Sequence, residues 1–177
     1  MLNLEKLFPE ILKEEHYFLD AHQSRISFYS TIIATILGAT IAGAAKVDNK
    51  NAYLLLLVGP LIVIALAHLG TYGTRTFYRR YLESVTVRAK MEQTLGLTKA
   101  QDGDSSDSVY WKGEAFIPER HVEARKEFAT SGEFVSKRMS MGYQKATEQL
   151  FSAFLAIAII LALVLIMIHV VMLIAGA

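Results

Sequence analysis

The chain has 177 residues, of which 53% are hydrophobic, 20% are charged and none is cysteine. Soluble domains usually carry about 25% charged residues, so this composition is unusually apolar. It excludes a disordered chain, a disulfide scaffold, a cysteine-based zinc site, a thiol nucleophile and a soluble nucleotide-binding domain. The formal net charge of +1 is a poor footprint for binding nucleic acid, which is not an expected partner.

The apolar residues cluster in three stretches that contain no Asp, Glu, Lys or Arg. These stretches are residues 26–45, 51–74 and 149–177. About 20 helical residues, at 1.5 Å per residue, cross a hydrocarbon core of roughly 30 Å. We therefore predict an all-α membrane protein with three transmembrane helices. The expected spans are 28–45 and 53–72, which form a hairpin, and a third helix in 150–177.

The positive charges predict the orientation of these spans. All 18 Lys and Arg residues lie outside the three stretches: three precede the first, Lys46 and Lys50 lie in the loop after it, and the other 13 lie between the second and the third. By the positive-inside rule, the N-terminus and the segment 73–149 are cytoplasmic, whereas the short loop and the C-terminus are outside. This pattern is typical of a multi-pass protein of the bacterial cell inner membrane.

The N-terminal segment 1–27 is predicted to be an amphipathic cytoplasmic helix. Pro9 suits a first helical position, and apolar residues from Phe8 to Phe18, followed by His22, recur at steps of three or four. This helix either lies on the inner leaflet or continues directly into the first span.

The segment 73–149 is predicted to be helical, with an acidic loop at 100–108 and Gly96 as a C-cap before it. Thr130 and Glu133 have the spacing of a capping box that starts another helix. That helix is expected to enter the third span, with a kink at Gly142.

In the first span, small residues recur at every fourth position, at Ala34, Gly38 and Ala42, and Ser27, Thr31 and Thr35 run along an adjacent stripe. We call these six residues together the small-residue stripe. Small residues at this spacing allow helix backbones to approach closely within a membrane. Three interpretations remain open: packing on the other spans of the same chain, contact between subunits, and the lining of a pore.

Three further features lie in or beside the spans. Gly59 and Pro60 predict a kink in the second span, because proline lacks the N–H that a helix interior needs. His68 and His169 are ionisable groups inside spans, with a structural or a functional role. Beside the inner membrane surface, aromatic residues interleave with the arginines expected to contact lipid headgroups, which are Arg75, Arg79 and Arg80.

The acidic and histidine side chains of the N-terminal segment predict a solvated helix surface. They are Glu14, Glu15, His16, Asp20 and His22. A catalytic zinc needs three ligands in defined geometry, and this set lacks matching spacing. We therefore expect neither a metal nor a cofactor.

The sequence contains no G-x-S-x-G, P-loop, G-x-G-x-x-G or H-E-x-x-H motif, so we expect no catalytic residues and no enzymatic activity. The layout resembles small bacterial inner-membrane proteins with a membrane hairpin and a helical cytoplasmic part. These include effector subunits of anti-phage systems that oligomerise and permeabilise the membrane, and the resemblance implies a role in antiviral defence.

Three functions are considered on this basis. The first is a homo-oligomeric effector that forms a pore or perturbs the membrane under the control of its cytoplasmic helices. The second is a membrane scaffold or accessory subunit that binds a protein partner in the cytoplasm. The third is a small lipid-modifying enzyme that uses His68 or the carboxylates of the N-terminal segment.

Overall fold

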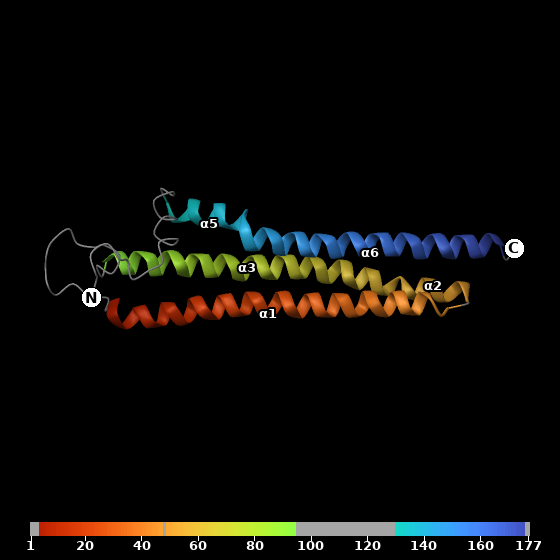
Figure 1. The fold of residues 1–177 in the computed structure, drawn as a ribbon, viewed down its shortest axis with the longest axis horizontal. Helices are drawn as coiled ribbons and strands as arrows, with labels where there is room; N and C mark the ends of the chain where they lie inside the picture. Colours follow the sequence, from red (N-terminus) through yellow and green to blue (C-terminus); the bar gives the residue numbers. More distant parts are fainter. Residues whose placement is uncertain (1–3, 48, 95–129, 176–177) are drawn as a thin grey trace. The chain divides into compact units, whose positions relative to one another are not determined.

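The computed structural model describes residues 4–47, 49–94 and 130–175, and every regular element in these ranges is an α-helix (Figure 1). The elements are α1 (Leu4–Ala44), α2 (Lys50–Leu56), α3 (Val58–Thr94), α5 (Ser131–Met139) and α6 (Gly142–Ala175). The all-helical prediction is confirmed for this part of the chain. The predicted acidic loop 100–108 and the C-cap Gly96 lie outside the described residues.

Three helices are long and apolar enough to cross a membrane, as the sequence predicts. They lie within Lys6–Ala44, Asn51–Glu92 and Gly132–Ala175. At 1.5 Å per residue, the 41 residues of α1 extend for about 60 Å, twice the thickness of a hydrocarbon core. The first expected span is therefore only part of a longer helix, and the second, 53–72, includes the end of α2 and the start of α3.

The predicted N-terminal helix and the first span form one continuous helix, α1. Pro9 lies inside this helix, five residues after its start, so its predicted place at the first helical position is wrong. Proline there removes a single intrahelical hydrogen bond close to the helix end. The chain stays helical after Pro9, as far as Ala44.

The second span is interrupted at Leu57, between α2 and α3. Asn49 caps α2, and its side chain accepts a hydrogen bond from the backbone N–H of Asn51 at 3.0 Å. Pro60 lies in the first turn of α3, where an N–H group has no intrahelical acceptor. The break lies at Leu57, whose φ of −62° and ψ of −22° are still helical, so the kink at Gly59 and Pro60 stays a prediction.

The third long helix is also preceded by a break. The predicted helix start is confirmed at α5, where Thr130 is the N-cap and its hydroxyl accepts a hydrogen bond from the N–H of Glu133 at 3.1 Å. α5 ends at Met139, and Gly142 begins α6 with a φ of +59°, which favours glycine. The sequence predicts one kinked helix here, and the structure has two helices.

The chain divides into two compact units. The first unit comprises Met1–Asp20 and Phe77–Met141, and the second comprises Ala21–Thr76 and Gly142–Ala177. In the second unit α1, α3 and α6 form a three-helix bundle, and α2 packs on α6 (Figure 1). The core of the bundle is a cluster of buried apolar residues from all three helices: Ile33, Leu37, Val63, Ala67, Phe151 and Ala158.

Phe151 and Gly70 set the distance between α3 and α6. The Phe151 side chain is 1% exposed, and a Cβ atom built on Gly70 would lie 2.5 Å from its Cε1 atom. Real carbon atoms do not approach so closely, so the ring occupies the space that any larger residue at position 70 would need. A similarly close approach occurs at Gly59, where an added Cβ would overlap the side chain of Thr40 on α1.

We predict that Gly70→Ala destabilises the protein, because the added methyl group overlaps the Phe151 ring. Overpacking of this kind costs about 1–3 kcal/mol. Thermal unfolding in one detergent measures the change. Gly38→Ala is the matched control, since no side chain lies within 4 Å of an added Cβ there. A Gly70→Ala protein that is as stable as Gly38→Ala would contradict the packing described here.

Candidate functional site

A layer of polar side chains is buried in the second unit between its three long helices. It comprises His22 on α1, Thr74 on α3 and Gln144 on α6, each with 0% of its surface exposed. Burying polar groups between apolar helices is costly unless they are hydrogen-bonded. The contacts of these three side chains therefore define the candidate site, which we call the polar layer.

His22 connects α1 to both other helices. Its Nδ1 atom lies 2.9 Å from the backbone oxygen of Thr74, and its ring meets the Tyr143 ring edge-on with centroids 5.4 Å apart. A carbonyl oxygen only accepts hydrogen bonds, so Nδ1 carries the proton and donates it. This hydrogen bond assigns the tautomer and holds α1 against α3 at this level.

The Gln144 side chain is hydrogen-bonded to Glu148, which lies beside Arg75. Its Nε2 atom donates to Oε1 of Glu148 at 3.1 Å, and Nε of Arg75 lies 4.0 Å from the same oxygen. The opposite amide orientation would set the Gln144 oxygen against the carboxylate, which is unfavourable. Gln144 Oε1 is therefore directed away from Glu148, and none of the described residues donates a hydrogen bond to it. A buried carbonyl without a donor costs about 1–3 kcal/mol.

The threonines near this level satisfy their hydroxyl groups within their own helices. Thr74 donates to the carbonyl of Gly70 at 2.8 Å, and Thr147 donates to the carbonyl of Tyr143 at 2.9 Å. The two hydroxyls are thus committed to helix backbones. His22 and Gln144 carry the side-chain chemistry of the polar layer.

All six residues of the small-residue stripe are exposed on α1. The buried positions of α1 in the core are Ile33 and Leu37 instead. The Thr35 hydroxyl donates to the carbonyl of Thr31 at 2.8 Å, so it does not reach another helix in this chain. The stripe therefore lies outside the intramolecular core.

The exposed surface of α6 has a different character from that of α1. It carries large aliphatic and thioether side chains that are more than half exposed, such as Leu163, Met167 and Val171. Lipid tails are as apolar as these side chains, so contact with the bilayer is as favourable for them as contact with protein. α1 also exposes Phe28 and Ile41, and α6 also exposes Ser152, Ala153 and Ala156, so the difference in side-chain size is between the small-residue stripe and the C-terminal half of α6.

The histidines singled out from the sequence are not in the polar layer. His68 on α3 is exposed and His169 on α6 is half-buried, whereas His22 is fully buried. The spacing of His22 from Phe18, within the predicted face, was the signal for its burial. His22 is the member of the N-terminal set that the structure brings to a site.

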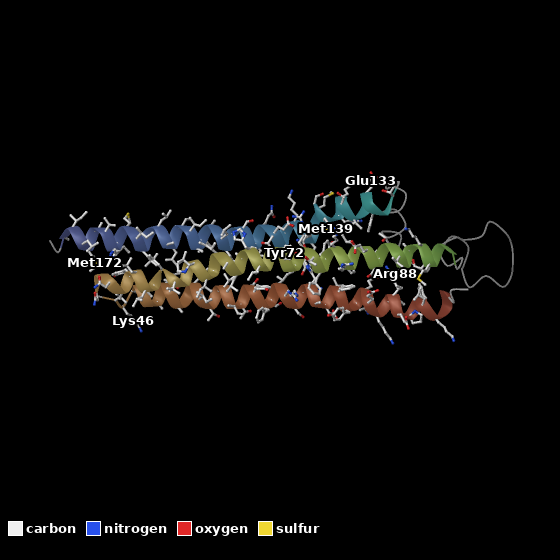
Figure 2. The ribbon with its side chains drawn as sticks, turned by 180° about the vertical axis from the view of Figure 1, so that it is seen from behind. Lys46, Tyr72, Arg88, Glu133, Met139 and Met172 are labelled. Atoms are coloured by element: carbon white, nitrogen blue, oxygen red, sulfur yellow. The ribbon has the colours of Figure 1, made fainter. Side chains whose placement is uncertain are left out.

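The three predicted headgroup arginines are exposed on α3. Arg75 approaches Glu148, while Arg79 and Arg80 both pair with Glu83, at 3.0 and 3.4 Å. Tyr72, labelled in Figure 2, is 75% exposed on the same helix. Exposed pairs of this kind contribute at most about 1 kcal/mol, so they do not prevent the arginines from exchanging partners.

The prediction of a solvated acidic surface is wrong for two of its five residues. Glu14, His16 and Asp20 are exposed, but Glu15 is only 7% exposed and His22 is fully buried. Glu15 and His22 continue the spacing of Phe8, Ile11 and Phe18 along the inward face of α1. The described residues contain no group of three His, Cys, Asp or Glu that could hold a metal ion.

Comparison of the chain with models of known families, with curated proteins and with solved structures finds no match. The side chains and their geometry are therefore the basis of the functional argument.

We predict different outcomes for two substitutions of Gln144. Gln144→Leu removes the buried carbonyl that accepts no hydrogen bond, which is stabilising, and the Nε2 hydrogen bond to Glu148, which is destabilising, so the free energy of unfolding should change by less than about 1 kcal/mol. Gln144→Glu sets a second carboxylate beside Glu148 in a buried position and should cost about 3 kcal/mol. Thermal unfolding in detergent at neutral pH compares them.

Gln149→Glu adds the same charge at an exposed position of α6 and is the matched control for Gln144→Glu. A large loss of stability in Gln144→Leu would show that the amide of Gln144 is fully hydrogen-bonded in the folded protein, against the description above.

Proposed function

We propose that this protein is a non-enzymatic, multi-pass protein of the inner membrane that self-associates through the small-residue stripe of α1. Its assembly would form a pore or otherwise perturb the membrane. The observation that carries the proposal is that all six stripe residues are exposed, while the core uses the other face of α1.

The size of the exposed side chains favours α1 over α6 as the contact between subunits. Lipid tails are as apolar as leucine, so helices associate in membranes through close van der Waals packing and not through hydrophobic burial. Gly38 and Ala34 allow that close packing, whereas the bulky α6 surface is suited to lipid. Exposed Thr31 and Ser27 would add hydroxyl groups to the contact or to a water-filled lining.

The charge distribution supports the proposed orientation. The basic residues gather on the sides of the spans assigned to the cytoplasm, and Arg75, Arg79 and Arg80 would contact anionic headgroups there. The first unit would then be the cytoplasmic part through which a signal controls assembly. The resemblance to anti-phage effectors in layout is in keeping with such a role.

Adding bulk to the stripe should weaken both assembly and membrane leakage. We predict that Ala34→Ile lowers the association constant by roughly tenfold, because loss of close packing costs on the order of 1–2 kcal/mol. Native mass spectrometry in mild detergent gives the stoichiometry, and release of a dye from liposomes gives the leakage.

Ala156→Ile is the matched control, since Ala156 is an exposed alanine on α6. It should leave both measurements unchanged. A strictly monomeric wild-type protein that keeps liposomes tight would refute the proposal. Co-purification of a stoichiometric protein partner without leakage would favour an accessory subunit instead.

A further inference from the structure

A second buried polar group lies in the first unit, apart from the polar layer. Glu15 on α1 and Glu92 on α3 are 7% and 4% exposed, and the Arg88 side chain is 19% exposed. Figure 2 labels Arg88 on α3. Charged residues are rarely buried to this extent unless they are paired. We call these three residues the ion cluster.

The ion cluster contains two carboxylates and a single guanidinium. Nε of Arg88 lies 3.0 Å from Oε2 of Glu15 and 3.7 Å from Oε1 of Glu92. With both carboxylates ionised, the three groups together carry a charge of −1. Arg88 must therefore divide its stabilisation between two acids.

Glu15 gains little from hydrogen bonding in this arrangement. Its Oε2 atom is buried and accepts no hydrogen bond from the described residues, because the Nε–H of Arg88 does not point at it. A buried carboxylate oxygen that lacks a donor is poorly compensated for its loss of water. Protonation relieves this cost, since it removes the charge and supplies an O–H donor.

We propose that the ion cluster is a proton-binding site, and that Glu15 takes up a proton when the N-terminal part of α1 docks on α3. The step forms one O–H bond on a Glu15 oxygen, with the proton drawn from water, and changes the cluster charge from −1 to zero. Undocking returns the carboxyl to water and releases the proton. The inference stands independently of the proposed self-association.

The charges around Glu15 agree in direction with this step. Burial raises the pKa of Glu15 above its ordinary value, and the nearby Glu92 carboxylate raises it further. Arg88 and the exposed His16 act against this rise, and burial outweighs both. The charged residues of α5 in the same unit are Glu133, Lys137 and Arg138, which are exposed.

The sign of the pH effect follows from this raised pKa. The docked state binds more protons than the undocked state, so docking is strengthened as the pH falls. The contribution is fully present below the ordinary carboxyl pKa of 4.5 and is lost as the pH rises through the raised pKa of Glu15. For one proton, the ratio of docked to undocked protein changes by at most about tenfold per pH unit.

The absence of cysteine allows docking to be measured directly in the full-length protein. Tyr17 on α1 and Val87 on α3 are exposed positions in the first unit, at which cysteines can carry spin labels. Double electron–electron resonance in detergent then reports the docked and undocked populations. We expect the docked-to-undocked ratio to fall by about threefold or more between pH 5 and pH 8.

Glu15→Gln mimics the protonated carboxyl and should stay docked with no pH dependence over this range. Glu14→Gln changes an exposed neighbour and should keep the dependence, as should His16→Gln. Docking that strengthens with pH, or a Glu15→Gln protein that is undocked or keeps the dependence, would overturn the proposal. So would loss of the dependence in Glu14→Gln or His16→Gln.

Discussion

The packing of the Phe151 ring against Gly70 is the constraint on which the second unit depends. Because no side chain at position 70 separates the two helices, α3 and α6 approach closely enough to share a narrow apolar core. Gln144 and Thr74 are buried in the same bundle, where His22 of α1 contacts the backbone oxygen of Thr74. One glycine contact thus determines the apolar packing of the bundle that also buries the polar layer.

Much of this architecture follows from sequence patterns that act locally. The length of the apolar spans can be read from continuous stretches of the chain. The Thr130 cap and the pairing of Arg79 with Glu83 each involve residues three or four positions apart. The helix breaks were harder to place, because a proline near a helix start and a proline inside a helix look alike in sequence. Pro60 lies in the first turn of α3, after the break at Leu57, and Pro9 lies within α1.

The candidate site was predicted less well than the fold, for a physical reason. Glu15 and His22 occupy the inward face of α1, but polar residues beside acidic neighbours read as a solvated surface. The spacing of His22 from Phe18 indicates this face, but the partners of the two residues, Arg88 and Thr74, lie more than fifty positions away, and no local pattern indicates which residues they contact. The small-residue stripe posed the reverse problem, since its spacing fits intramolecular and intermolecular packing equally.

The exposed face of α1 also has an entropic consequence. Glycine and alanine lose no side-chain rotamer freedom when they are covered, whereas leucine and methionine lose about 0.5–2 kcal/mol each. A contact made through Ala34, Gly38 and Ala42 would order almost nothing beyond the helices themselves. A contact through Leu163 and Met167 of α6 would have to immobilise side chains that the bilayer leaves free to move.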